Sequence, residues 1–190
     1  KIQFQIEKGL DADVFFSAAT TQMNALKDEN LVDADSISNV LENKLVLIKG
    51  KDSTTTVTGL DNIKDASIIA IGDPEVVPAG SYAKEALTNL GVWDSIQDRL
   101  SLAGNVTEVL SQVETQNAEI GLVYATDAAS SDKVEVVAEC DNSLLVTPVL
   151  YPVGRVSSTK HKDEANSLIE FLKSDKALKV FKKYGFKKGE

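Results

Sequence analysis

Short, mainly apolar runs alternate along the chain with stretches in which apolar residues recur at helical spacing. The short runs are typical of buried strands; they cover residues 13–16, 44–48, 67–71, 100–103 and 118–124. Helical spacing is found in residues 20–30, 82–90, 106–116, 162–172 and 175–184. Strands that alternate with helices predict an α/β fold with a largely parallel sheet and covered faces.

Other segments give weaker patterns. Residues 2–9 resemble the last turns of a helix that ends at Gly9, and residues 133–139 alternate like a half-exposed strand. Residues 146–156 predict a strand interrupted by Pro148 and Pro152, and we place it at a sheet edge because proline donates no ladder hydrogen bond.

The two C-terminal helices are predicted to bury one apolar side each. The inward residues predicted are Ala165, Leu168, Ile169, Leu172, Leu178, Val180 and Phe181. The lysines between residues 173 and 188 are then interpreted as a solvated face.

The stretch from Gly72 to Gly91 combines a strand end, a tight loop and a helix start. A second such unit follows at residues 100–116, where Asn105 is a predicted N-cap and Glu108 completes a capping box. Such geometry aims free backbone N–H groups and a positive helix end at an anion. By itself, the Gly72–Gly91 stretch is better explained as an ordinary βα unit with a glycine-containing turn.

Carboxyl ends of parallel strands are where α/β sheets bind ligands. The loop at 72–80, the helix start at 104–106 and Tyr124 all follow predicted strands. Two helices that open near Ala79 and at Val106 leave amides unpaired, and Tyr124 can add a hydroxyl donor. Because these loops contain no Lys or Arg, neutral donors would hold the anion, which favours a fully desolvated tetrahedral oxyanion.

The amino-acid composition argues against several classes of function. The 190 residues are 43% hydrophobic and 26% charged, with a net charge of −9, which is ordinary for a globular protein and argues against a nucleic-acid partner. The single Cys140 excludes a cysteine metal cluster, and the single His161 argues against a histidine-dependent triad and a multi-histidine metal site. Asp73 is interpreted as a turn residue, so we predict no enzyme and no cofactor.

Several motifs carry a resemblance to a known family. They are GDPEVVPAGSYAKEALTNLGVWD, LAGNVTEVL, GLVYATDAA, LYPV and FLKSDKALKVFKKYGF, in that order along the chain. In sequence and spacing they resemble the periplasmic molybdate-binding proteins of molybdate ABC importers. The resemblance implies a two-lobed type II periplasmic-binding-protein fold that closes on molybdate or tungstate held in the cleft by Ala79, Val106 and Tyr124. It also implies an ABC permease as partner and a periplasmic or lipid-anchored extracytoplasmic location.

One departure from the family pattern concerns the first lobe. The chain starts just after the position of the family's second serine-containing loop, so the two serines that would complete the anion site are not in it. Ser17 matches a different position and is expected to be a packing or hinge residue. We therefore expect an incomplete first lobe, weak or no anion binding by this chain, and possible self-association through an uncovered sheet edge.

The predicted lobes are residues 1–49 with 133–190 (lobe 1) and residues 50–132 (lobe 2). An alternative ligand is another tetrahedral oxyanion such as sulfate. An alternative class is the ligand-sensing domain of a transcription regulator, although no DNA-binding helix-turn-helix is visible in this acidic chain.

Overall fold

The computed structural model describes residues 2–189, which form two compact units. Unit 1 consists of the segments up to Asn43 and from Val149 onward, and unit 2 is Lys44–Pro148. The predicted lobes assigned residues 44–49 and 133–148 to lobe 1, whereas the structure places them in unit 2. The reason is strand pairing: β3 (Leu45–Gly50) hydrogen-bonds to β7 (Val134–Glu139) and to β6 (Ile120–Tyr124), so all three strands belong to one sheet.

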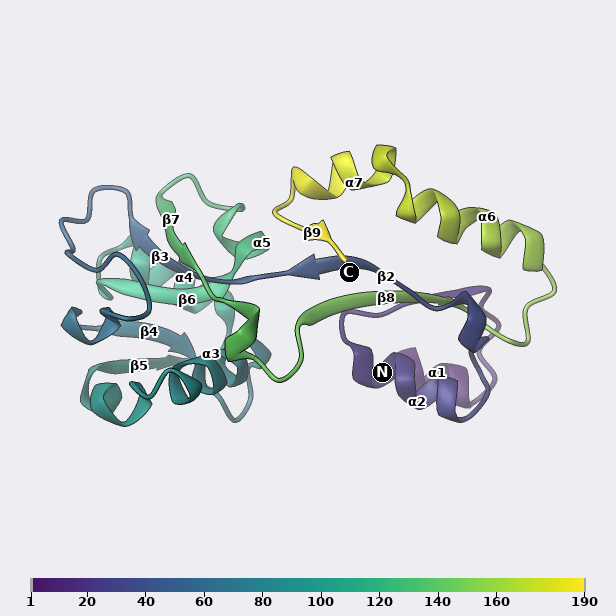
Figure 1. The fold of residues 1–190 in the computed structure, drawn as a ribbon, viewed down its shortest axis with the longest axis horizontal. Coiled ribbons are helices and arrows are strands. Elements are labelled where there is room, and N and C mark those ends of the chain that lie inside the picture. Colours follow the sequence, from purple (N-terminus) through teal and green to yellow (C-terminus); the bar gives the residue numbers. More distant parts are fainter. Residues whose placement is uncertain (1, 190) are drawn as a thin grey trace. The chain divides into compact units, whose positions relative to one another are not determined.

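Unit 2 is built on a five-stranded sheet of order β5-β4-β6-β3-β7 (Figure 1). Strand β4 (Ile69–Gly72) runs parallel to β5 (Leu100–Ala103) and to β6, whereas β3 is antiparallel to both β6 and β7. The prediction of a largely parallel sheet therefore holds for only three of the five strands. Hydrophobic runs locate strands but carry no information on the direction of their partners.

Side chains that alternate along the strands of unit 2 build two apolar layers. Leu45 and Leu47 face α3 (Pro78–Asn89), whereas Val46 and Ile48 face α4 (Val106–Glu114). Helix α5 (Ala125–Ala128) adds to the second layer through Ala128. Short 3-10 turns at Ile63–Asp65, Trp93–Arg99 and Asn142–Leu144 complete the unit, and Trp93 packs on the α3 side.

Two glycines set the position of α3 on the sheet. A Cβ on Gly80, in the first turn of α3, would lie 2.0 Å from the carbonyl oxygen of Gly72 at the end of β4. A Cβ on Gly72 would lie 2.5 Å from a methyl carbon of Val77. Both positions therefore require glycine for close backbone approach, and the approach holds the start of α3 against the end of β4.

Unit 1 contains a four-stranded antiparallel sheet of order β1-β8-β2-β9. The strands are β1 (Val14–Phe16), β2 (Ser38–Asn43), β8 (Val149–Arg155) and β9 (Lys187–Lys188). The predicted edge position of β8 is wrong, because β8 lies between β1 and β2. Pro152 is tolerated there because it sits opposite Asn39, where a register shift interrupts the ladder with β2.

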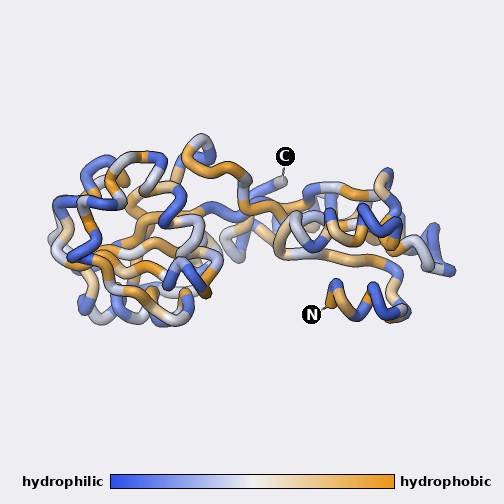
Figure 2. Tube along the Cα trace, turned by 90° about the horizontal axis from the view of Figure 1, so that it is seen from below, coloured by the Kyte–Doolittle hydropathy of each residue, from blue (hydrophilic) through white to orange (hydrophobic). Residues whose placement is uncertain are grey.

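Helices cover both faces of the unit 1 sheet (Figure 1). Helices α1 (Ile2–Glu7) and α2 (Thr20–Asp28) bury Ile6, Met23 and Leu26 on one face. Helices α6 (Lys162–Lys173) and α7 (Asp175–Lys182) bury Ala165, Ile169 and Ala177 on the other. Figure 2 shows apolar stretches along the strands and polar stretches in the outer loops.

Two residues predicted to face inward in the C-terminal helices are exposed instead. Leu168 is 46% exposed and Val180 is 51% exposed. Ala177, Leu178 and Phe181 form the packed side of α7, so Val180 is left on its flank. Helical spacing alone does not give the width of a buried stripe, which depends on the surface beneath the helix.

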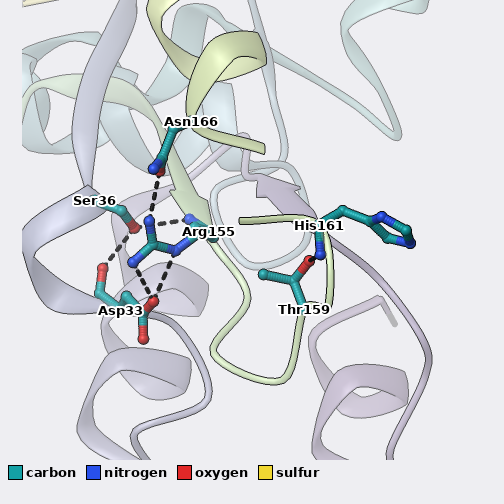
Figure 3. Close-up of polar contacts among 6 residues, drawn as sticks. All are labelled: Asp33, Ser36, Arg155, Thr159, His161 and Asn166. Atoms are coloured by element: carbon teal, nitrogen blue, oxygen red, sulfur yellow. Dashed lines mark hydrogen bonds and ion pairs between the residues drawn. The ribbon is translucent and has the colours of Figure 1, made fainter. Parts of the chain in front are cut away.

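An ion pair joins β8 to the segment before β2 in unit 1 (Figure 3). Arg155 Nε and Nη2 donate to Asp33 Oδ2 at 2.8 and 2.6 Å, and Arg155 Nη1 donates to Asn166 Oδ1 of α6 at 2.6 Å. The backbone N–H of Arg155 donates to Ser36 Oγ at 2.8 Å. The hydrogen bond from Arg155, with a second from Ser157, lowers the pKa of the Asp33 carboxyl below its ordinary value.

The single histidine belongs to a separate polar group nearby. The His161 backbone N–H donates to Thr159 Oγ1 at 3.0 Å, and the Thr159 hydroxyl donates to the carboxylate of Asp13. The imidazole points away from the Arg155 ion pair (Figure 3). Among residues 2–189 no group of three His, Cys, Asp or Glu side chains is arranged to hold a metal ion.

Gly80→Ala is expected to destabilise unit 2 by about 2 kcal/mol, because the new methyl group would overlap a backbone carbonyl that has no free space to move into. The usual gain from replacing glycine by alanine in a helix is about 1 kcal/mol and is outweighed. Urea unfolding measures the change. Gly104→Ala is the control, since its Cβ would meet only Glu108 Oε2 at 3.6 Å; equal stabilities of the two variants would contradict the close-approach argument.

Asp33→Asn is expected to lower the free energy of unfolding at pH 7 by about 1 kcal/mol, through loss of a charged hydrogen bond. A carboxyl whose pKa is lowered in the folded state stabilises the protein above the ordinary pKa of 3.8. This stabilisation is lost as the pH falls. The difference from wild type should therefore shrink below about pH 4. Chemical unfolding at several pH values tests this, with the exposed Asp11→Asn as control; a pH-independent difference would refute it.

Candidate functional site

Three strand ends meet at one edge of the unit 2 sheet, as the sequence predicts. Strands β5, β4 and β6 are adjacent and parallel, so Ala103, Gly72 and Tyr124 end at the same edge, across a span of about 10 Å. The backbone N–H of Asp73 donates to the carbonyl oxygen of Ala103 at 2.8 Å and joins two of these ends. This edge, with the helix starts that follow it, is the candidate site.

Helix α3 begins at this edge with a proline in its first turn. Pro78 has no N–H to leave unpaired, and the N–H groups of Gly80 and Ser81 donate to the carbonyl oxygen of Val77 at 2.9 and 3.1 Å. The N–H of Ala79 has no hydrogen-bond acceptor among residues 2–189. Since Ala79 is 1% exposed, this amide is a buried donor at a positive helix end.

Helix α4 begins on the other face of the sheet at the same edge. Asn105 Oδ1 accepts from the N–H of Glu108 at 2.9 Å, which confirms the predicted N-cap. The Glu108 side chain accepts from the N–H of Gly104 at 2.9 Å, one residue before the expected cap position. The N–H groups of Val106 and Thr107 have no acceptor within residues 2–189 and remain as donors at this helix start.

Tyr124 is the last residue of β6 and is half-buried. Its ring lies edge-on against the ring of Tyr82 in α3, with centroids 6.5 Å apart. Its backbone N–H donates to Asp127 Oδ2 at 3.1 Å, so the carboxylate closes the turn from β6 into α5. Tyr82 and Asp127 are additions to the residues predicted for this edge; the signal for Asp127 is an acidic residue three positions after a strand end, as in a capping box.

A lysine also lies beside this edge. Strand pairing sets Leu45 opposite Tyr124, and the N–H of Ala125 donates to the carbonyl oxygen of Lys44 at 2.8 Å. The loops themselves contain no Lys or Arg, as the sequence shows, but the pairing of β3 with β6 brings Lys44, the residue before β3, to the end of β6. Hydrogen bonds from Ser143 lower the pKa of Asp141 and the charge of Lys44 adds to this effect, whereas at Cys140 the same charge only partly offsets a raised pKa.

The carboxylate and hydroxyl groups near the edge form hydrogen bonds with the local backbone, and the nearby thiol is protonated. Asp73 Oδ1 accepts from the N–H of Glu75 at 3.0 Å, which confirms Asp73 as a turn residue, and the Ser81 hydroxyl donates to the carbonyl oxygen of Pro74 at 2.7 Å. Burial, with the nearby charge of Asp141, raises the pKa of the Cys140 thiol to about 11, so the thiol stays protonated at neutral pH.

A cavity of about 570 Å³ lies at the opposite edge of the same strands, next to the loop of residues 52–56. There Glu119 accepts hydrogen bonds from the N–H and hydroxyl of Ser67 at 2.8 and 2.7 Å and from the hydroxyl of Thr55. Burial raises the pKa of Glu119, but these hydrogen bonds outweigh it and lower the pKa overall. The carboxylate therefore ties the loop to the start of β4.

The two α/β units and the solved structures that the chain resembles identify the class: solute-binding proteins with the type II periplasmic fold. Residues 1–187 match the family described as "Bacterial extracellular solute-binding protein", and the chain belongs to it. Within residues 2–189 no helix has the length and apolar character needed to span a bilayer.

Named relatives of this chain cover most of its length. It is 43% identical to the putative ABC transporter substrate-binding lipoprotein YvgL of Bacillus subtilis, over 97% of this chain and 71% of the relative. It is 37% identical to the molybdate-binding protein ModA of Escherichia coli, over 96% of this chain and 72% of that one. The substrate-binding domain of a putative molybdenum ABC transporter from Clostridium difficile superposes with a TM-score of 0.94 at 39% identity, covering 100% of this chain and 82% of that one.

Asp127→Asn is expected to keep or raise stability at pH 7, because asparagine still accepts from the Tyr124 N–H without a half-buried charge. Burial raises the pKa of Asp127, and the hydrogen bond from Tyr124 only partly offsets this. A carboxyl with a raised folded-state pKa costs stability as pH rises above its ordinary value of 3.8. The stability of wild type should therefore rise relative to that of the Asn variant as the pH falls toward 4.

Urea unfolding between pH 4 and 7 measures this difference. Asp127→Ala removes the acceptor as well as the charge and should be about 1 kcal/mol less stable than the Asn variant. A strong loss of stability in Asp127→Asn at pH 7 would show that the charge itself is required.

Proposed function

We propose that this protein is an extracytoplasmic solute-binding protein that captures molybdate or tungstate and delivers it to the permease of an ABC importer. The observation that carries the proposal is the convergence of Ala79, Val106 and Tyr124 at one sheet edge. Two helix starts there present amides that have no acceptor within residues 2–189, and Tyr124 ends β6, the strand beside β4. These are neutral donors, which suit an oxyanion that accepts hydrogen bonds and carries no proton.

The type of donor sets the ligand class. A fully deprotonated tetrahedral dianion offers acceptors in every direction, so it satisfies converging N–H groups without donating to any of them. An anion that retains a proton would present a donor to these donors and lose a hydrogen bond. Molybdate and tungstate meet this requirement, as does sulfate, so discrimination among the three depends on ligand size.

The charge distribution of unit 2 supports short-range recognition. Its residues 44–148 include 16 Asp and Glu against 7 Lys and Arg, so the net charge of −9 resides in the unit that carries the donors. Long-range attraction therefore cannot draw the anion in. Amides at contact distance must supply the affinity, while distant carboxylates are screened by salt.

The names of the relatives agree with this ligand and location. Those from E. coli and C. difficile are named for molybdate and for molybdenum transport, and the one from B. subtilis is named a lipoprotein. We extend these properties to this chain: a molybdate or tungstate ligand without any cofactor, a membrane permease as partner, and an extracytoplasmic, membrane-associated location.

Calorimetric titration of the protein expressed from its complete gene, with molybdate, tungstate and sulfate, tests the proposal. We expect molybdate and tungstate to bind at least tenfold more tightly than sulfate. Added NaCl should not weaken binding, because neutral donors hold the anion. Equal affinity for sulfate would overturn the ligand assignment, and absence of binding by all three would overturn the function.

Tyr124→Phe is expected to weaken molybdate binding about tenfold by removing one hydroxyl donor. Ala79→Pro should weaken it more, because it deletes a buried amide donor at a helix position that tolerates proline sterically. Tyr184→Phe is the matched control, since Tyr184 is 66% exposed in unit 1. Unchanged affinity in both site variants, with intact thermal unfolding, would refute these contacts.

A further inference from the structure

The charges of unit 1 are distributed unevenly. Its segments hold 13 Lys and Arg and 13 Asp and Glu, so the unit as a whole is balanced. Seven of the basic residues fall between residues 173 and 188, where the only acidic residue is Asp175. These lysines are Lys173, Lys176, Lys179, Lys182, Lys183, Lys187 and Lys188. The C-terminal part of unit 1 is therefore a basic region on an acidic protein.

Helix α7 and Lys183, the C-cap residue that follows it, arrange three of these lysines in one line. The buried side of the helix is formed by Ala177, Leu178 and Phe181, which pack toward the sheet. Lys176, Lys179 and Lys183 recur at i, i+3 and i+7, opposite that side, and all three are exposed. We call these three residues the lysine stripe; in Figure 1, α7 lies along the outside of unit 1.

The lysine stripe is not neutralised by the part of the chain that the structure describes. Among residues 2–189, no carboxylate forms an ion pair with any of its three ammonium groups. Lys173, by contrast, pairs with Glu170 at 2.8 Å. A solvated face that only kept the protein soluble would not need one sign of charge on an otherwise acidic molecule.

Apolar side chains flank the lysine stripe. Val180 is 51% exposed and Tyr184 is 66% exposed, and both belong to the same segment. A helix surface that mixes lysines with an exposed tyrosine and valine matches the composition of segments that lie at a lipid–water interface. The absence of arginine from residues 173–189 argues against paired recognition of protein carboxylates, for which arginine is the better suited residue.

We propose that the lysine stripe, with Val180 and Tyr184, docks unit 1 on an anionic phospholipid surface. Lysine ammonium groups would lie among the phosphates, and the two apolar side chains would enter the head-group region. Such a contact would hold the protein near the membrane that contains its permease. It involves none of the residues assigned to anion binding, so it stands independently of the proposed ligand.

Vesicle co-sedimentation tests this contact with the protein expressed from its complete gene and without a lipid anchor. We expect binding to phosphatidylglycerol–phosphatidylcholine vesicles at 50 mM NaCl, loss of binding at 500 mM NaCl, and none to phosphatidylcholine alone. The triple variant Lys176→Gln, Lys179→Gln, Lys183→Gln should bind about 100-fold more weakly, at roughly fivefold per lysine. Thermal unfolding of the same variant verifies that it is folded.

The matched control is Lys51→Gln, Lys64→Gln, Lys133→Gln, which removes the same charge from exposed positions of unit 2. It should bind vesicles as wild type does. Val180→Asn with Tyr184→Ser should weaken binding severalfold at unchanged charge. The proposal is overturned if wild type does not bind anionic vesicles, or if both triple variants bind them equally. It is also overturned if the lysine stripe binds an acidic surface of the permease and does not bind vesicles.

Discussion

The close approach of two backbones, at Gly72 and Gly80, is the constraint on which the candidate site depends. Because neither residue has a Cβ, the first turn of α3 can lie directly against the end of β4. The amide of Ala79 is thereby buried at the sheet edge and kept from any acceptor in the described chain. An amide held in this way needs no rearrangement to bind an anion, so little ordering free energy is lost on binding.

The two units differ in their net charge and in how that charge is distributed. Unit 2 carries the whole net negative charge, and its strand ends present amide and hydroxyl donors with Lys44 as a neighbouring cation, so we expect contact geometry to select its ligand. Unit 1 is balanced overall but concentrates lysines along α7. In the two proposals, the same chain recognises a small dianion by desolvated amides and an extended anionic surface by solvated ammonium groups. The two modes differ in their response to salt, because only the second relies on long-range attraction.

Much of the fold was predictable from local pattern. Local residues determine the strands that meet at the site and the N-cap at Asn105. They also determine the end of α3 at Gly91, which has a φ of +77°. Each of these features depends on interactions between residues only a few positions apart. The direction of each strand and the identity of its neighbours in the sheet were harder to predict from the sequence. Pro152 indicated an edge, yet β8 is central because a register shift in β2 accommodates the proline.

The sequence by itself determined which residues follow the strand ends, and hence that Ala79, Val106 and Tyr124 are candidate donors, because turn and cap chemistry is local. Only the tertiary structure decided that the ends of β5, β4 and β6 are adjacent and parallel. It also decided that Tyr82, Asp127 and Lys44 lie beside them. These neighbours depend on pairing between segments tens of residues apart, and that pairing is set by the packing of the whole sheet.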